Sequence, residues 1–140
     1  DVSKDPGNLK TPRVSFGAGL KNEEWVHEIT SKGFDGEAIP MAWMNQVTTL
    51  YDLPLEIAYD NLNPSAEYFI RVAYTGRFRS KIKMTADEII IHDFIKTGIE
   101  PMYEFPIPTE IIKDGKVTFS WTCGEAERGA QVSELWIIKK

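Results

Sequence analysis

Alternation of apolar and polar side chains predicts β-structure in the middle of the chain. Apolar side chains occupy every second position of residues 55–59 and again of residues 68–74. The intervening residues 61–65 are rich in Asn, Pro and Ser, which favour a turn. We therefore predict two strands joined as a hairpin. The second strand is apolar on one face and mixed on the other, which favours a central position in a sheet that packs on a second sheet.

Further short strands are predicted on both sides of this pair. Val, Phe and Trp alternate with Thr and Ser over residues 117–121, and Val132, Trp136 and Ile138 share one face of the closing segment. Residues 102–107 contain or border three prolines, which predicts an edge strand. The side chains expected in the core are Ile70, Val72, Phe119, Trp121 and Trp136. Weaker strand patterns cover residues 13–16, 41–44, 48–51, 82–85 and 89–94, with a turn at 86–88.

Helix is nearly absent from these predictions. Residues 20–40 have a poor pattern, which we interpret as a long loop with one helical turn around Trp25, Val26 and Ile29. About eight or nine strands with minimal helix predict an all-β fold. Tyr68 after Leu62-Asn63-Pro64 is similar to the tyrosine corner of immunoglobulin-like domains, but at least four strand candidates follow it. A jelly-roll β-sandwich fits that count better.

Length and composition limit the classes of protein to consider. The 140 residues fit one domain, and we predict a linker or N-terminal arm over residues 1–12 and a single β-sandwich domain over 13–140. The chain begins at Asp1, and we expect it to be part of a longer polypeptide. A formal charge of -5 and a pI near 5.1 disfavour nucleic-acid binding. No apolar run approaches the roughly 20 residues of a membrane span.

Catalytic motifs are weak throughout the sequence. The two histidines, His27 and His92, lack the spacing of a metal site, and the single cysteine, Cys123, has no nucleophile signature around it. The basic run Arg77, Arg79, Lys81 and Lys83 alternates, which is typical of a solvated strand face. Carboxylates are numerous, but none lies in a motif that separates it from surface charge. We predict that the domain is not an enzyme.

Two segments carry a resemblance to a known family. Residues 43–76 (WMNQVTTLYDLPLEIAYDNLNPSAEYFIRVAYTG) and 128–140 (RGAQVSELWIIKK), joined by the strand VTFSW, resemble the galactose-binding-like β-sandwich modules of bacterial polysaccharide-degrading enzymes. The resemblance covers about residues 41–140. It implies a noncatalytic carbohydrate-binding module that binds a poly- or oligosaccharide beside a catalytic domain of the same polypeptide. It also implies an extracellular or periplasmic protein. The alternative is an architectural or interaction domain without its own ligand.

Sugar binding requires an aromatic platform with planar polar partners, and the sequence offers two clusters of that kind. We expect the ligand on loops at one end of the sandwich, with Trp43, Tyr51, Arg77 and Arg128 as the best candidates. Guanidinium groups there favour an acidic or richly hydroxylated glycan. For Trp43, a place in the core stays an open alternative. The full set of candidate contacts is Trp43, Asn45, Gln46, Tyr51, Asp52, Arg77, Phe78, Arg79, Arg128 and Gln131.

The resemblance also raises the question of a metal ion. In such modules an acidic residue of the closing strand can help to bind a structural calcium ion, which takes oxygen ligands from carboxylates and carbonyls. Glu134 is that residue here, with Asp5, Asp35 or Asp60 as possible partners. Glu134 otherwise faces solvent or is held by a neighbouring side chain.

Overall fold

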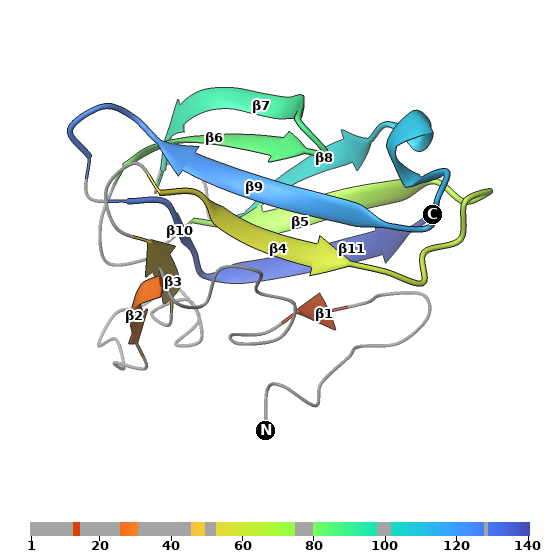
Figure 1. The fold of residues 1–140 in the computed structure, drawn as a ribbon, viewed down its shortest axis with the longest axis horizontal. Helices are drawn as coiled ribbons and strands as arrows, with labels where there is room; N and C mark the ends of the chain where they lie inside the picture. The colour runs from red at the N-terminus through yellow and green to blue at the C-terminus, as the bar shows by residue number, and fades with distance from the viewer. Residues whose placement is uncertain are drawn as a thin grey trace.

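The computed structural model describes residues 13–14, 26–30, 46–49, 53–74, 80–97, 102–127 and 129–140. These residues form strands and one short 3-10 helix, and none of the described helical residues forms a segment able to cross a membrane. The elements, drawn in Figure 1, are β1 (Arg13–Val14), β2 (Val26–Thr30), β3 (Gln46–Thr49), β4 (Leu55–Tyr59), β5 (Tyr68–Ala73), β6 (Lys81–Ala86), β7 (Ile89–Lys96), β8 (Tyr103–Ile107), η4 (Thr109–Ile112), β9 (Val117–Cys123), β10 (Gln131–Val132) and β11 (Glu134–Lys139).

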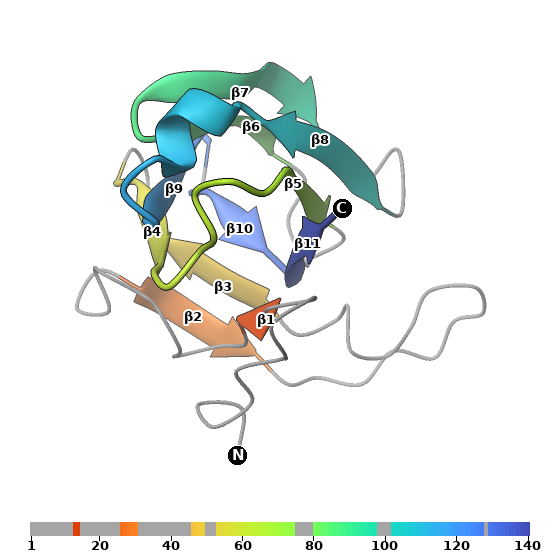
Figure 2. The same cartoon turned by 90° about the vertical axis from the view of Figure 1, so that its right-hand side faces the viewer.

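Two four-stranded antiparallel sheets face each other, in the orders β1-β11-β5-β8 and β4-β9-β6-β7 (Figure 2). A smaller sheet, β10-β3-β2, places β2 and β3 to one side of the sandwich. From β4 to β9, every step along the chain crosses between the two large sheets except the step from β6 to β7. This winding is that of a jelly roll, so the predicted all-β sandwich is confirmed.

The predicted hairpin of residues 55–74 is wrong, although both of its strands exist. β4 pairs with β9, and β5 lies between β11 and β8 in the opposite sheet. The connection turns away from β4 because the Leu62 amide donates to the Gly115 carbonyl at 2.9 Å, and the Asn63 amide donates to the Tyr68 hydroxyl at 2.9 Å. The segment therefore carries the chain from one sheet to the other. The predicted central position of β5 is confirmed.

The hairpin within a sheet is β6–β7. Asp87 and Glu88 have φ values of 45° and 72°, the left-handed conformation that a tight hairpin turn requires of both central residues. The Asp87 carboxylate accepts a hydrogen bond from the Thr118 amide at 2.9 Å, which fixes the turn to β9. The turn predicted at residues 86–88 is confirmed, and β8 is the edge strand that its prolines predicted.

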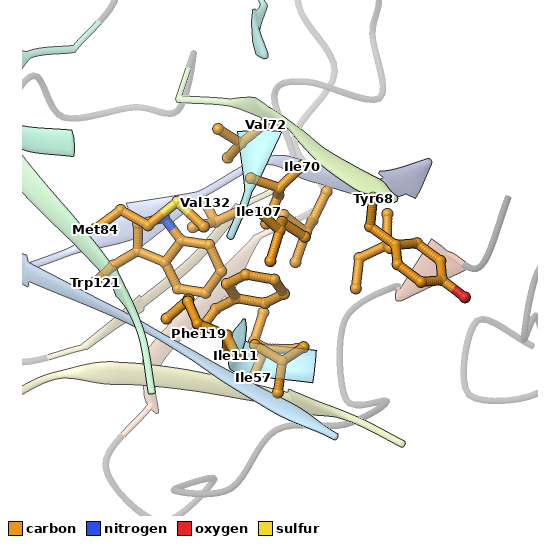
Figure 3. Close-up of a cluster of buried hydrophobic side chains, with 14 of the residues drawn as sticks. Ile57, Tyr68, Ile70, Val72, Met84, Ile107, Ile111, Phe119, Trp121 and Val132 are labelled. Carbon is orange, nitrogen blue, oxygen red and sulfur yellow. The ribbon is translucent and has the colours of Figure 1, made fainter. Parts of the chain in front are cut away.

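The core fills the space between the two large sheets. Ile70, Val72, Phe119 and Trp121 each have 0% of their surface exposed. Figure 3 shows the Trp121 indole beside Met84, and the Phe119 ring among isoleucines of β4 and η4. Alternate positions of β5 and β9 therefore point inward, as predicted for these two strands.

The predicted inner face of the closing strand is wrong. Leu135 and Ile137 are buried, whereas Trp136 and Ile138 are half-buried and occupy the opposite face of β11. The chain bends at Ser133, between β10 and β11, so the buried side chains Val132 and Leu135 are three positions apart instead of two. A break of this kind reverses the face of every later residue in a strand.

The N-terminal part differs from its prediction as well. Residues 26–30 form a strand, β2, instead of a helical turn, because Val26, Ile29 and Thr30 have branched side chains that favour extended backbone and pair with β3. Their ladder contains a register shift between Val26 and Glu28, which weakens the alternation that a sequence pattern detects. β3 begins two residues before the predicted 48–51, and residues 41–44 lie outside the described residues.

Candidate ligand-binding end of the sandwich

The two ends of the sandwich differ in how their connections are closed. At one end, here called the turn end, the chain passes through residues 60–67, 87–88 and 108–116 (Figure 1). Side chains there cap nearby backbone: Asn63 accepts from the Ser65 amide at 2.9 Å, and Asp114 accepts from the Lys116 amide at 3.0 Å. These contacts are local turn chemistry, so the turn end is a structural feature.

Buried polar side chains gather at the opposite end, here called the loop end, where β5, β7 and β9 finish and β4, β6 and β8 begin. Polar side chains inside a protein usually have hydrogen-bond partners, and the hydroxyls of Thr48, Thr49 and Thr97 donate to backbone carbonyls here. Six of the seven buried polar side chains of the described part lie here: Thr48, Thr49, Ser80, Thr97, Gln131 and Ser133.

Ser80 and Thr97 clamp two of the connections together. The Thr97 amide and hydroxyl both donate to the Ser80 carbonyl, at 3.0 and 2.9 Å, and the Ser80 amide donates back to the Thr97 hydroxyl at 3.1 Å. Because both residues are buried, these bonds are shielded from water. The clamp fixes the start of β6 against the end of β7.

A close approach of two backbones fixes a third connection. The Thr49 amide donates to the Ala130 carbonyl at 3.1 Å, and the Thr49 hydroxyl donates to the Leu53 carbonyl at 2.6 Å. Gly129 has φ of 147° and lies so near Thr49 that a β-carbon there would be 1.8 Å from the Thr49 carbonyl oxygen. Only glycine fits this position.

The loop end is where the predicted sugar contacts are anchored. Residues 50–52, 75–79 and 128 are flanked by Thr49 and Leu53, by Tyr74 and Ser80, and by Glu127 and Gly129, and all six flanking residues lie at this end. Trp43 and Asn45 instead precede β3. Gln46 opens β3 opposite Thr30, and Gln131 is fully buried opposite Thr48, so its amide is part of the scaffold. The other predicted contacts, Trp43, Asn45, Tyr51, Asp52, Arg77, Phe78, Arg79 and Arg128, lie outside the described residues.

The structure separates two of the residues considered for calcium. Glu134 begins β11 opposite Ala73 at the loop end, whereas Asp60 follows β4 at the turn end. The length of β5, about 16 Å at strand rise, lies between them. The Trp136 indole N–H donates to the Glu134 carboxylate, which is thus held by a neighbouring side chain. Among the described residues no three His, Cys, Asp or Glu side chains gather as metal ligands, and Asp5 and Asp35 lie outside that part.

The outer face of sheet β1-β11-β5-β8 carries paired charges. Arg71 binds Glu104 at 2.7 Å, and Lys140 lies 3.6 Å from the same carboxylate. The hydrogen bond from Arg71 holds the pKa of Glu104 below its ordinary value. The Lys140 ammonium also lies 4.7 Å from the centre of the Phe69 ring. One carboxylate, that of Glu104, thus pairs with two cationic side chains on this face.

His92 belongs to a buried hydrogen-bonded chain. The Trp121 indole N–H donates to the Tyr74 hydroxyl at 2.8 Å, and that hydroxyl lies 2.8 Å from His92 Nε2. His92 Nδ1 lies 2.8 Å from the Asp93 carbonyl, an acceptor, so we assign the proton to Nδ1 and the acceptor role to Nε2. Burial lowers the pKa of His92 and raises that of Tyr74, which keeps both groups neutral. The partners are a phenol, an indole and a carbonyl, an arrangement suited to a structural role.

This chain predicts a loss of stability in acid. The pKa of His92 lies below its unfolded value of about 6.5, so the unfolded state binds the proton first as the pH falls. The contribution of His92 is therefore complete above pH 6.5 and decreases from there through the lowered folded pKa. Urea unfolding at pH 7.5, 6.0 and 5.0 measures this decrease, and His92→Gln should flatten it. An equal pH dependence in the variant would contradict the assignment.

Comparisons with known proteins identify the fold. Neither a family model nor a curated protein sequence matches the chain. Among solved structures, the ANXUR1 extracellular domain of Arabidopsis thaliana is similar over 85% of this chain and 36% of its own, at 9% identity and a TM-score of 0.60. Protein YXIM_BACsu of Bacillus subtilis is similar over 87% and 31%, at 17% identity and a TM-score of 0.55. The chain thus spans about a third of either protein.

A family 35 carbohydrate-binding module from Clostridium thermocellum is also similar, over 79% of this chain and 84% of its own, at 16% identity and a TM-score of 0.45. At these identities a likeness concerns the fold alone. The likeness to the first two structures therefore extends to the fold of this chain and no further. Function has to be argued from the site itself.

Proposed function

We propose that the domain is a noncatalytic carbohydrate-binding module whose ligand site is at the loop end. The observation that carries this proposal is the convergence of the anchors: segments 50–52, 75–79 and 128 each leave from and return to described residues at one end of the sandwich. These segments hold Tyr51, Arg77, Phe78, Arg79 and Arg128, an aromatic and guanidinium set suited to sugars. A rigid scaffold with variable loops at one end is a common arrangement for binding.

The chemistry of this set favours an acidic or richly hydroxylated glycan. Guanidinium groups form charge-assisted, bidentate hydrogen bonds with carboxylates, and aromatic rings cover the apolar face of a pyranose. Affinity is modest because a shallow site exchanges hydrogen bonds to water for hydrogen bonds to protein. We also propose that the module is exported and serves a catalytic domain of the same polypeptide, and that calcium, if bound, takes Glu134 together with residues other than Asp60.

Affinity electrophoresis through gels that contain polysaccharides tests the proposal. We expect at least one polysaccharide to retard the domain, and Arg77→Ala to weaken binding about three- to tenfold, as expected for loss of one or two hydrogen bonds. Arg71→Ala is the matched control, because Arg71 lies on the outer face of β5 and is paired with Glu104. Trp43→Ala should weaken binding in a folded protein; an unfolded variant would assign Trp43 to the core. Unchanged binding in both Trp43→Ala and Arg77→Ala would place the site elsewhere.

A second candidate function, docking on a neighbouring domain, is supported by one observation. Ile89 and Ile90, at the start of β7, are 44% and 57% exposed, although large apolar side chains are usually buried. An architectural domain would keep such a surface covered by its neighbour. Absence of retardation by any polysaccharide, together with binding to the adjacent domain of the polypeptide, would favour this function.

A further inference from the structure

The outer side of sheet β4-β9-β6-β7 carries a row of lysine side chains that also bears on ligand binding. Lys81 and Lys96 are directly opposite each other in the β6–β7 ladder, and both are exposed. Lys83 lies on the same face of β6 as Lys81, because Ile82 and Met84 alternate with these two lysines and are buried in the core. The Lys83 ammonium lies 5.2 Å from the centre of the Phe94 ring. We call these four residues the basic face.

The three ammonium groups of the basic face form no ion pair with the described carboxylates, although the Glu127 and Lys81 side chains lie on the same side of Gly124. No described carboxylate lies within ion-pair distance of Lys81, Lys83 or Lys96, in contrast to Arg71 and Lys140 on the other sheet. The neighbouring acid Asp93 accepts a hydrogen bond from the Phe94 amide at 2.7 Å. Like charges directly across a ladder repel each other, so the Lys81–Lys96 pair destabilises the free domain. A bound anion would remove that cost.

Phe94 gives the basic face an apolar centre. Its ring is 45% exposed on the edge strand β7, where the ladder shifts register between Ile82 and Met84. Strand β9, on the other side of β6, places Thr122 beside Lys83 and Ser120 beside Thr85, so hydroxyl side chains lie across the lysine-bearing strand from the ring. An exposed ring beside an ammonium group matches a pyranose that carries a carboxylate: the ring covers the C–H face, and the ammonium groups bind the charge.

We propose that the basic face binds an anionic polysaccharide of the polyuronate class. The charge complementarity is local, since the chain as a whole is acidic, with a formal charge of -5. A nucleic acid is disfavoured because its binding depends on many simultaneous phosphate contacts, and the basic face offers only three ammonium groups. The basic face begins at the loop end, where Lys81 follows Ser80 and Lys96 precedes Thr97, and it extends along the outer side of the sheet to Lys83 and Phe94. The two proposed sites use different residues, so the lysine variants and Arg77→Ala test them separately.

The test uses native electrophoresis through gels with and without polygalacturonate. The triple variant Lys81→Gln, Lys83→Gln, Lys96→Gln is compared with Lys113→Gln, Lys116→Gln, Lys139→Gln, which removes the same charge from exposed lysines at the turn end. We expect wild type to be retarded, and the first triple variant to bind about tenfold more weakly. The control triple variant should bind as wild type does. Phe94→Ala should weaken binding without reversing its dependence on salt.

Results of three kinds would overturn the proposal. The first is equal binding by the two triple variants, or no retardation of wild type by polygalacturonate. The second is equal retardation by a fully methyl-esterified galacturonan, which lacks the charge, or equal binding to a DNA duplex. The third is self-association through β7, seen as a dimer in analytical ultracentrifugation that Phe94→Ala converts to monomer. Arg77→Ala, measured in the same gels, shows whether any remaining retardation comes from the loop end.

Discussion

Replacing Trp121 by alanine will destabilise the domain by about 3 to 5 kcal/mol, the usual cost of removing a large aromatic side chain from a core. Trp121 has no exposed surface, and its ring lies in the middle of the core beside Met84 (Figure 3). Its indole N–H is the donor that completes the hydrogen bonding of the Tyr74 hydroxyl. Urea unfolding followed by far-ultraviolet circular dichroism measures the change in the free energy of unfolding.

Trp136→Ala is the comparison that makes this result informative. Trp136 is half-buried on the outer face of β11, where its indole N–H binds Glu134. Its loss removes less apolar contact and leaves no cavity between the sheets, so we expect less than half of the effect of Trp121→Ala. Equal effects of the two substitutions would contradict the assignment of β11 faces described above.

Gly129→Ala is the second substitution with a large expected effect. A β-carbon would meet the Thr49 carbonyl oxygen at 1.8 Å, and the φ of 147° is a conformation that other residues rarely adopt. Relief of the clash requires backbone movement that breaks the bond from the Thr49 amide to the Ala130 carbonyl. Overpacking and backbone strain together predict a loss of about 3 kcal/mol or more. Thermal and urea unfolding both measure it.

Gly124→Ala is the matched control in the same connection. A β-carbon at Gly124 would lie 3.5 Å from side-chain atoms of Glu127 and Lys81, which is ordinary van der Waals contact. The expected change is within about 0.5 kcal/mol. If Gly129→Ala were as mild as Gly124→Ala, the close approach that fixes the loop end would be wrong.

Much of the fold could be predicted from the sequence because side-chain direction in a strand has a period of two. The inner faces of β5 and β9 follow directly from the alternation around Ile70 and Phe119. Strand partners do not follow, because a connection such as residues 60–67 suits a hairpin and a crossing between sheets equally well. The hydrogen bond from Leu62 to Gly115, which selects the crossing, joins residues 53 positions apart.

The closing strand and the site show where the sequence pattern fails. The bend at Ser133 turns Leu135 into the core and Trp136 to the outer face, and the order of apolar residues does not predict this bend. The loop segments that contain Arg77 and Arg128 could be located from strand ends, but the buried clamp of Ser80 and Thr97 could not, since both residue types are common in exposed loops. The sequence alone could not show that Lys81 and Lys96 lie opposite each other, because their pairing follows from the register of the β6–β7 ladder.

The measurement that tests carbohydrate binding at the loop end most directly is a chemical-shift map of the backbone amides. An oligosaccharide of the polysaccharide that retards the domain would be titrated into labelled protein. We expect shifts concentrated at the loop-end amides of Thr49, Leu53, Tyr74 and Ala130, which lie outside β6 and β7, while Leu62 and Gly115 at the turn end stay unchanged. Shifts concentrated at the turn end, or binding without shifts at the loop end, would contradict it.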